Sequence, residues 1–156
     1  MSVGPSTEPL SGAFDGREHV LPVRVYYEDT DFTGVVYHAS YLRFCERGRT
    51  EFLRAAGVEH AALLALPDPC AFAVTRMQIA FRKAARVDDA LAVRTLYHHV
   101  RGVRIEARQR IMRGEELIAE AEVEIVCIRP DGRPRRPPPE LIERIAPYVS
   151  PDAPQP

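Results

Sequence analysis

The sequence predicts an α+β fold in which one amphipathic helix covers the inner face of an antiparallel sheet. Apolar residues recur at helical spacing from Tyr41 to Ala56, and Gly57 stands where a glycine commonly ends a helix. Apolar and polar residues then alternate with a period of two along successive segments between residues 71 and 127. A strand, a long helix and then a run of antiparallel strands is the element order of an α+β domain.

The composition is that of one ordinary globular domain. At 156 residues the chain can form a single core but not two. A net charge of −1 gives no overall attraction to nucleic acid or to an anionic membrane. The three cysteines have no metal-ligand spacing, which indicates reduced thiols. Because no apolar run reaches the length of a membrane span and residues 1–20 lack a signal-peptide pattern, we expect a cytoplasmic protein.

The first half of the chain predicts a tail, a strand and two helices. Residues 1–18 are rich in Gly, Ser, Pro and acids, so we expect a disordered tail before a domain over residues 19–148. The β-branched and aromatic segment Leu21–Tyr27 predicts the first strand. Gly48 lies inside the long helix, where glycine costs about 0.5–1 kcal/mol relative to Ala. It therefore predicts close approach of the helix backbone to a sheet or another helix, and Glu59–Leu66 predicts a short second helix.

Four longer strands are predicted next, and the last three, joined at Arg101-Gly102 and Arg113-Gly114, form an antiparallel meander with one solvent-exposed face. Arginines and glutamates alternate on the outward faces of the last two strands, so the two rows can pair across the sheet. The proline-rich C-terminal region predicts a short amphipathic helix over Glu140–Tyr148 and a disordered tail over residues 149–156. The predicted inward rows are Ala71, Ala73, Thr75, Met77, Ile79 and Phe81; Leu91, Val93, Thr95 and Tyr97; Val103, Ile105, Ala107, Gln109 and Ile111; and Ala119, Ala121, Val123, Ile125 and Cys127.

An acidic segment joins the first strand to the long helix, and it holds the candidate chemistry. Glu28, Asp29 and Asp31 lie within four residues, followed by Gly34 and His38. Acids just before a helix face unpaired backbone N–H groups and a positive dipole end. That arrangement suits a carboxylate that works beside an amide stabilising an oxyanion. An isolated D-x-D is more often a helix-capping loop, so the choice between a capping loop and a catalytic segment depends on the longer sequence pattern.

The longer pattern is V-R-V-Y-Y-E-D-T-D-F-T-G-V-V-Y-H-A-S-Y over residues 23–41, followed by E-R-G-R-T-E over residues 46–51. It resembles the hotdog-fold acyl-CoA thioesterases of the 4-hydroxybenzoyl-CoA thioesterase family, above all their bacterial Tol-Pal-associated branch. The similarity continues through A-A-R-V-D-D from Ala84 and E-A-E-V-E-I-V-C from Glu120, and covers about residues 21–148.

This resemblance implies an antiparallel sheet of about five strands wrapped around one long helix. It implies hydrolysis of an acyl-CoA thioester to a free acid and coenzyme A, with no metal or redox cofactor. It also implies a homodimer or tetramer, because the family's site is completed by a second subunit. An acyl-carrier protein or a Tol-Pal-linked protein is a further partner that rests on the resemblance alone; no nucleic acid and no membrane span are expected.

The resemblance assigns catalysis to Asp31 and His38. Asp31, the second acid of D-x-D, would act as general base on water or attack the carbonyl to form an anhydride. His38 matches the residue whose backbone N–H points at the thioester oxygen in relatives. Strand alternation would place Asp29 and Asp31 on one face, so only the family match separates them.

Coenzyme A phosphates require basic side chains at the mouth of a pocket. The basic turn over residues 82–86 matches the family's basic-Pro-Ala-Arg segment, with Ala84 in place of proline. Three further arginines between residues 133 and 136 form a second basic cluster, and either cluster can be a solvated turn. Gly34 would permit a tight turn or close ligand approach, while the two tyrosines would line the acyl pocket or core. The predicted substrate-binding residues are Gly34, Tyr37, Tyr41, Arg82, Lys83 and Arg86.

Two other kinds of site are excluded at this stage, and one alternative function stays open. A Cys–His pair fails because His38 and Cys45 lie seven residues apart, roughly 10 Å along a helix. His98 and His99 should point to opposite faces of a strand, which excludes a two-ligand metal site. The alternative is a catalytically weak module that binds acyl-CoA or acyl-carrier protein and scaffolds envelope or lipid machinery. The intact Asp31 and His38 argue against it.

Overall fold

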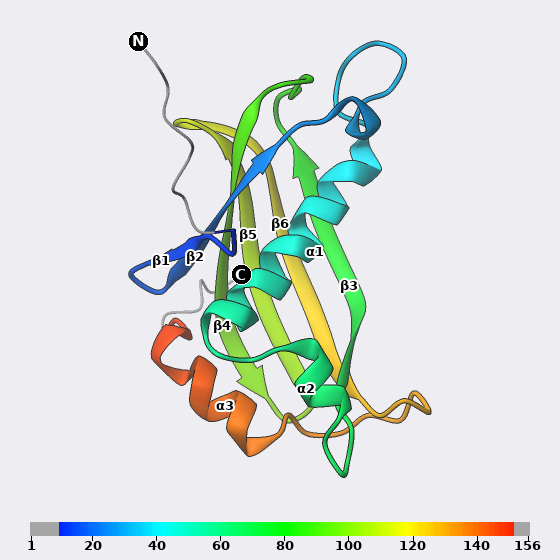
Figure 1. Cartoon of the computed structure of the whole chain (residues 1–156), viewed down its shortest axis with the longest axis vertical. Helices are drawn as coiled ribbons and strands as arrows, with labels where there is room; N and C mark the ends of the chain where they lie inside the picture. The colour runs from blue at the N-terminus through cyan, green and yellow to red at the C-terminus, as the bar shows by residue number, and fades with distance from the viewer. Residues whose placement is uncertain (1–9, 152–156) are drawn as a thin grey trace.

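Six antiparallel strands form one sheet in the computed structural model, which describes residues 10–151 (Figure 1). The strand order is β1-β2-β4-β5-β6-β3, so β3 and β1 are the two edges. The sheet has one strand more than the five predicted, and the additional strand is the short β1. The strands are β1 Ala13–Asp15, β2 Glu18–Arg24, β3 Ala71–Phe81, β4 Ala90–Arg101, β5 Arg104–Arg113 and β6 Glu116–Ile128.

One long helix lies across a face of this sheet, as the sequence predicts (Figure 1). This helix, α1, spans His38–Ala55, and Gly57 follows it with a φ of 90°. Two apolar clusters lie along α1, one around Phe44 near its start and one around Phe52 near its end. Each buried phenylalanine contributes about 1.5–3 kcal/mol to the stability of the fold.

The smaller helices are α2 His60–Leu64 and α3 Pro139–Ile145, with 3-10 turns at Tyr27–Asp29 and Ala146–Tyr148. No helix within residues 10–151 combines the length and apolarity needed to cross a membrane.

Gly48 marks the closest approach of α1 to the sheet, which confirms its predicted role. A Cβ at this position would lie 2.7 Å from Val93 Cγ1 and 2.9 Å from Thr95 Oγ1. The Gln109 amide donates across the same contact to the carbonyl oxygen of Cys45 at 2.8 Å and to Thr95 Oγ1 at 2.9 Å. The absence of a side chain at Gly48 therefore lets a buried amide of β5 bond to the helix backbone.

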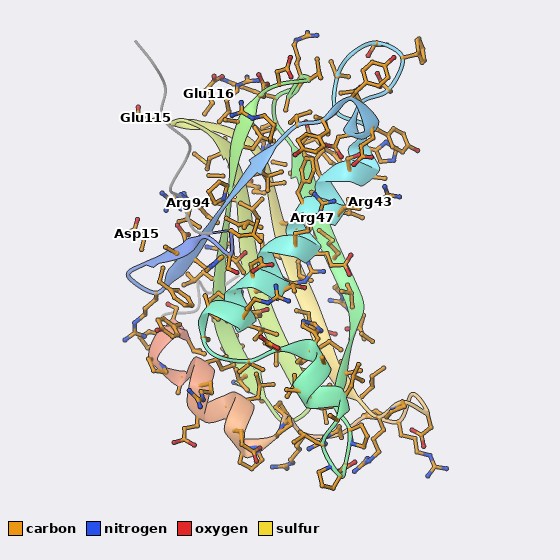
Figure 2. All side chains as sticks on the ribbon, in the orientation of Figure 1. Asp15, Arg43, Arg47, Arg94, Glu115 and Glu116 are labelled. Carbon is orange, nitrogen blue, oxygen red and sulfur yellow. The ribbon has the colours of Figure 1, made fainter. Side chains whose placement is uncertain are left out.

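The other face of the sheet carries the predicted pairing of opposite charges. Arg108 Nε lies 2.6 Å from Glu122 Oε1, its cross-strand partner. Arg94 of β4 pairs with Glu18 of the adjacent β2 at 2.6 Å and reaches Asp15 of β1 at 3.5 Å, and Figure 2 labels both Arg94 and Asp15. These pairs explain most of the charge on this face without a polyanionic ligand.

The predicted phase of β3 is wrong in its first half. The β3–β6 register shifts between Val74 and Arg76, so Thr75 is the extra residue of a bulge. Before the bulge, Phe72 and Val74 lie opposite Cys127 and Ile125 on the helix side of the sheet, where Ala71, Ala73 and Thr75 were expected; Phe72 packs against the core, and Val74 stays about half exposed. After it, Met77 and Ile79 take up the predicted inward positions.

A second bulge corrects the prediction for the two adjacent histidines. The β4–β5 register shifts between Tyr97 and His99, which makes His98 the extra residue. The rings of His98 and His99 consequently lie 5.5 Å apart between centroids, instead of on opposite faces. Both bulges break the strict alternation of side chains on which those two predictions depended.

Both predicted tails are shorter than expected. Residues 1–9 and 152–156 lie outside the described residues, so the expectation of disorder stays a prediction there. Within residues 10–18, β1 pairs with β2, and the Phe14 ring stacks on Tyr148 at 3.7 Å between centroids. At the other end, the Ser150 N–H donates to the Tyr97 carbonyl oxygen at 2.8 Å. The folded unit therefore extends beyond residues 19–148 in both directions.

Candidate active site

The acidic segment begins with a 3-10 turn that Asp29 stabilises. β2 ends at Arg24, earlier than predicted, and Tyr27–Asp29 form the turn. The buried Asp29 carboxylate accepts the Tyr26 N–H at 2.8 Å. Its carbonyl oxygen accepts the Tyr37 N–H at 2.9 Å and the Ser40 hydroxyl at 3.0 Å. Asp29 therefore joins the end of the strand to the start of α1, which is a structural role.

Asp31 lies in the tight loop that follows, and its side chain is partly exposed. Oδ1 accepts the Thr33 hydroxyl at 2.6 Å and the Thr33 N–H at 2.8 Å. These two bonds hold the pKa of the Asp31 carboxyl below its usual range, with the hydroxyl the larger cause. No donor in the described part of the chain bonds to Oδ2. Asp31 thus offers one ionised oxygen that is not engaged by the fold.

Gly34 closes this loop, as the sequence predicts. Its φ is 81°, and its N–H donates to the Asp31 carbonyl oxygen at 3.1 Å. The Asp31 N–H in turn donates to the carbonyl oxygen of Val35 at 2.9 Å. A Cβ on Gly34 would meet no atom within 4 Å, so the requirement for glycine comes from the left-handed backbone.

His38 is the first residue of α1, and its side chain is exposed. Its backbone N–H has no acceptor among residues 10–151, as expected for the first turn of a helix. The ring lies 4.5 Å from that of Tyr37 between centroids, and Tyr37 is itself about half exposed. The start of α1 therefore presents a free amide donor and two accessible rings.

Tyr41 has a different role from Tyr37. It is buried, and its hydroxyl accepts the Ala85 N–H at 3.1 Å. Burial raises the pKa of the Tyr41 phenol. Tyr41 therefore lies in the core, where it supports the turn after β3, and its contact with an acyl group stays a prediction.

The turn after β3 brings Arg86, one of the three predicted basic residues, next to the acidic segment. The Val36 N–H donates to the Ala85 carbonyl oxygen at 2.8 Å, and Val35 forms an isolated β-bridge with Arg86. No carboxylate among the described residues lies within 4.0 Å of the Arg86 guanidinium. Arg82 and Lys83, by contrast, pair with glutamates of β6 at 2.6 and 3.0 Å.

Arg113 and Asp89 hold the same turn, and sequence reasoning missed both. The Arg113 guanidinium donates to Asp89 Oδ2 at 2.8 Å and to the Ala84 carbonyl oxygen at 3.1 Å. The backbone N–H of Arg86 also donates to Asp89 at 2.9 Å, and these bonds lower the pKa of Asp89. Asp89 is part of the A-A-R-V-D-D motif, but the only signal for Arg113 is its place at the end of β5.

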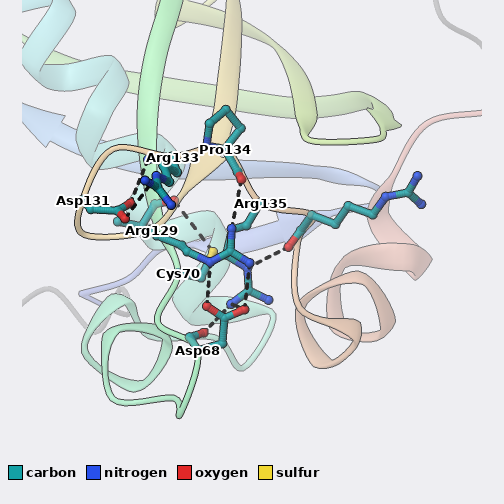
Figure 3. Close-up of polar contacts among 9 residues, drawn as sticks. Asp68, Cys70, Arg129, Asp131, Arg133, Pro134 and Arg135 are labelled. Atoms are coloured by element: carbon teal, nitrogen blue, oxygen red, sulfur yellow. Dashed lines mark hydrogen bonds and ion pairs between the residues drawn. The ribbon is translucent and has the colours of Figure 1, made fainter.

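The second basic cluster is not near the acidic segment. Arg129 donates to both carboxylate oxygens of Asp68 at 3.0 and 3.2 Å, and Arg135 donates to the Asp68 carbonyl oxygen (Figure 3). Arg133 lies 3.7 Å from Asp131 in the same segment. Arg129 and Arg135 thus fix the C-terminal extension to the loop before β3, at the opposite end of the molecule from the loop that joins β2 to α1 (Figure 1).

An apolar cavity of about 200 Å³ lies between the second half of α1 and the sheet. None of the predicted substrate-binding residues lines it. It starts at Glu46, eight residues into α1, which is roughly 12 Å from His38 along the helix axis. Its lining residues are Glu46, Arg49, Thr50, Leu53, His60, Phe72, Val74, Tyr97, Ile105, Ile125 and Ile145.

Cys45 is no competing nucleophile. It is buried against the sheet, and burial raises the pKa of its thiol to about 11. A thiol with so high a pKa forms almost no thiolate near neutral pH.

Comparison with known proteins agrees with this geometry. Residues 25–145 match the family described as the thioesterase-like superfamily. The acyl-CoA thioester hydrolase YbgC of Escherichia coli is 48% identical over 110 residues, which cover 70% of this chain and 81% of that protein. The acyl-CoA thioesterase YbgC of Haemophilus influenzae is 46% identical over 108 residues, covering 69% and 79%.

A solved structure gives the same result for the fold. The crystal structure described as a probable thioesterase from Bartonella henselae superposes with a TM-score of 0.76 at 42% identity. It covers 78% of this chain and 99% of that one. With a family match over residues 25–145, the chain belongs to the thioesterase-like superfamily and has the hotdog fold.

Proposed function

We propose that this protein hydrolyses an acyl-CoA thioester to a free acid and coenzyme A, with Asp31 as the catalytic carboxylate. The observation that carries the proposal is the state of Asp31: its carboxyl has a lowered pKa and one oxygen that the fold leaves free. The unpaired N–H of His38 at the start of α1 supplies the donor for an oxyanion.

In the general-base route, Asp31 takes a proton from water, and the water oxygen bonds to the thioester carbonyl carbon. The carbonyl oxygen becomes an oxyanion, which accepts a hydrogen bond from the backbone N–H of His38. The tetrahedral intermediate then collapses, the carbon–sulfur bond breaks, and the proton on Asp31 passes to the departing sulfur. In the nucleophilic route, Asp31 itself bonds to the carbonyl carbon, the carbon–sulfur bond breaks, and the coenzyme A thiolate leaves and takes a proton from water. A water molecule then hydrolyses the resulting anhydride, which releases the acid and restores the Asp31 carboxylate. Both routes require the ionised carboxylate.

Arg86 is the favoured ligand for a coenzyme A phosphate. It bridges to Val35 of the catalytic loop and has no carboxylate within 4.0 Å among the described residues. Arg82 and Lys83 are occupied by glutamates of β6, so we assign them a weaker contribution. Tyr37 and Gly34 complete the proposed substrate contacts, because Tyr37 is exposed beside the helix start and Gly34 is partly exposed in the loop before it.

A second subunit would complete the site. The apolar cavity beneath the second half of α1 does not include Asp31 among its lining residues, which supports an acyl pocket that a second subunit completes. β3 is an edge of the sheet and carries Val74 and Phe81 about half exposed. Long apolar edges commonly pair with another chain, which supports a homodimer through β3 or a tetramer built from such dimers.

We also place the protein in the cytoplasm. Its three cysteines are free thiols, as expected in a reducing compartment. An acyl-carrier protein or a Tol-Pal-linked protein is a further partner in this proposal, supported by family resemblance alone.

Release of free thiol from a panel of acyl-CoA thioesters tests the activity. The panel should span straight chains of increasing length and aromatic acyl groups, with the Asp31→Asn variant as the control. Thiol release that depends on Asp31 supports the proposal. Saturable acyl-CoA binding without release from any substrate would instead establish the alternative, a catalytically weak binding module.

A further inference from the structure

The bulge in β4 places two histidines and a glutamate together on the outer face of the sheet. One ligand atom each from His98, His99 and Glu106 lie within 4.8 Å of one another. His98 Nδ1 lies 4.0 Å from Glu106 Oε2. We propose that this outer-face histidine cluster (His98, His99 and Glu106) is a binding site for a divalent transition-metal ion, with Zn²⁺ as the preferred ion. Two imidazoles and one carboxylate are a ligand set that suits Zn²⁺ and leaves a fourth position open.

The hydrogen bonding of His98 prepares one nitrogen for a metal. His98 Nε2 lies 3.1 Å from Glu122 Oε2, and because a carboxylate only accepts, Nε2 carries the proton. Nδ1 is then the nitrogen with the free lone pair. The His98 side chain is only 7% exposed, and its Nδ1 atom is buried without a hydrogen-bond partner among the described residues. A buried polar atom without a partner costs free energy, and a metal ion would satisfy it.

Glu122 is positioned to support His98 as a metal ligand without binding the ion itself. Histidines that bind metals usually donate their other ring N–H to a carboxylate, which fixes the ring orientation and raises the basicity of the ligand nitrogen. The pair of His98 and Glu122 has this arrangement. Arg108 donates to the other Glu122 oxygen at 2.6 Å, which holds the carboxylate in position.

At the histidine cluster, the cross-strand pairs of β5 and β6 change from opposite charges to like charges. The neighbouring cross-strand pairs on β5 and β6 are Arg108 with Glu122 and Arg110 with Glu120, each of opposite sign. At the cluster, Glu106 lies opposite Glu124. Like charges in direct opposition destabilise a sheet, and a bound cation beside Glu106 would offset that repulsion.

The spacing of the ligand atoms is close to what a metal requires. Bonds of about 2.0–2.1 Å to tetrahedral Zn²⁺ separate two ligand atoms by roughly 3.3 Å. The three atoms must therefore move together by about 1 Å. The Glu106 side chain is 39% exposed, so it can make this movement and also gives the ion access from solvent.

The cluster is separate from the proposed active site. His98 lies eight residues after the start of β4, the end nearest the catalytic loop, which corresponds to roughly 26 Å along the strand. It also faces away from α1. The proposed metal site therefore does not depend on the proposed thioester hydrolysis, and each can be tested without the other.

Titration of the chelator-treated full chain with Zn²⁺, followed by calorimetry, tests the site. We expect one Zn²⁺ per chain, and a Tm raised by about 5–10 °C at a hundredfold excess over Kd. His99→Gln and Glu106→Gln each remove one proposed ligand and should weaken binding by at least about tenfold, since the loss of a residue that merely supports a ligand already costs that much. Glu115→Gln, at the exposed β5–β6 turn, is the matched control and should bind as the unchanged protein does.

Absence of Zn²⁺ binding in the unchanged protein would overturn the proposal. So would binding that survives in both His99→Gln and Glu106→Gln, because the ion would then be held elsewhere. Far-UV circular dichroism of each variant shows that it is folded. Both substitutions are at partly exposed side chains, so the fold should survive them.

Discussion

The Ser40 hydroxyl donates a 3.0 Å hydrogen bond to the backbone carbonyl oxygen of Asp29. The N–H of Tyr37 donates to the same oxygen at 2.9 Å. These two bonds fix the first turn of α1 against the 3-10 turn, so the loop that carries Asp31 is held at both ends. The position of Asp31 relative to the helix N-terminus therefore depends on the backbone of Asp29, which has a structural role in the loop.

Thr33→Val should shift the acid limb of the pH–rate profile to higher pH. The Thr33 hydroxyl is the largest cause of the lowered pKa of Asp31, and valine removes it while keeping the backbone N–H bond. Activity requires the carboxylate and is lost as the pH falls through its pKa. Raising that pKa therefore moves the loss of activity upward from the acid side. Rates of acyl-CoA hydrolysis between pH 3 and 8 measure the shift; an unchanged acid limb would contradict the assignment of that limb to Asp31.

Arg86→Ala should raise KM for acyl-CoA by about three- to tenfold, the effect of losing one exposed charged contact. The kcat should change less, because a phosphate contact is equally strong in the ground and transition states. Arg82→Ala is the control, since its guanidinium is occupied by Glu120 at 2.6 Å. With an acyl-pantetheine substrate, which lacks the nucleotide phosphates, the Arg86 effect should vanish. A KM effect that persists there would exclude the phosphate role.

Gly48→Ala should destabilise the fold in spite of the better helix propensity of alanine. The new Cβ would lie 2.7 Å from Val93 Cγ1 and 2.9 Å from Thr95 Oγ1. Overpacking costs about 1–3 kcal/mol, against a gain in propensity of at most about 1 kcal/mol. Urea denaturation measures the difference in the free energy of unfolding. Val93→Ala makes room, so the double variant should show favourable coupling of at least about 0.5 kcal/mol; a Gly48→Ala protein more stable than the original would refute the close contact.

Light scattering should find a mass of at least twice the 17.5 kDa of one chain at micromolar concentration. The reasons are the exposed apolar edge at β3 and the separation of the apolar cavity from Asp31. Activity per chain should fall on dilution as the oligomer dissociates. A monomer with full activity would rule out the shared site.

The regular parts of the fold could be predicted from sequence because they obey simple periods. The inward rows of β4, β5 and β6 alternate as predicted, and Gly57 ends α1 with the left-handed backbone that its position requires. The bulges at Thr75 and His98 could not be predicted, because an inserted residue changes the phase of a strand without changing its composition. The outer-face histidine cluster depends on the second of these bulges.

The candidate site was predictable in part. The motif identified Asp31, Gly34 and His38, but tertiary contacts decide which neighbours support them. Burial separates Tyr41 from Tyr37, and ion pairs with β6 separate Arg82 from Arg86. These distinctions depend on residues far away in the chain, which local patterns do not reveal.

Asp31→Asn compared with Asp29→Asn tests the catalytic assignment most directly. Both substitutions remove one negative charge, two residues apart, and keep the size of the side chain. An Asn at position 29 can still accept the Tyr26 N–H through its amide oxygen, and the backbone bonds to the helix start are unaffected. Asp29→Asn should therefore cost well under tenfold in kcat.

The decisive measurement is kcat for acyl-CoA hydrolysis by the two variants under the same conditions. We predict that Asp31→Asn lowers kcat at least about 10²-fold, the lower range for a positioned acid–base group, while KM and the urea midpoint stay close to those of the unchanged protein. Equal losses in both variants would indicate a shared electrostatic role. A fully active Asp31→Asn enzyme would contradict the central claim.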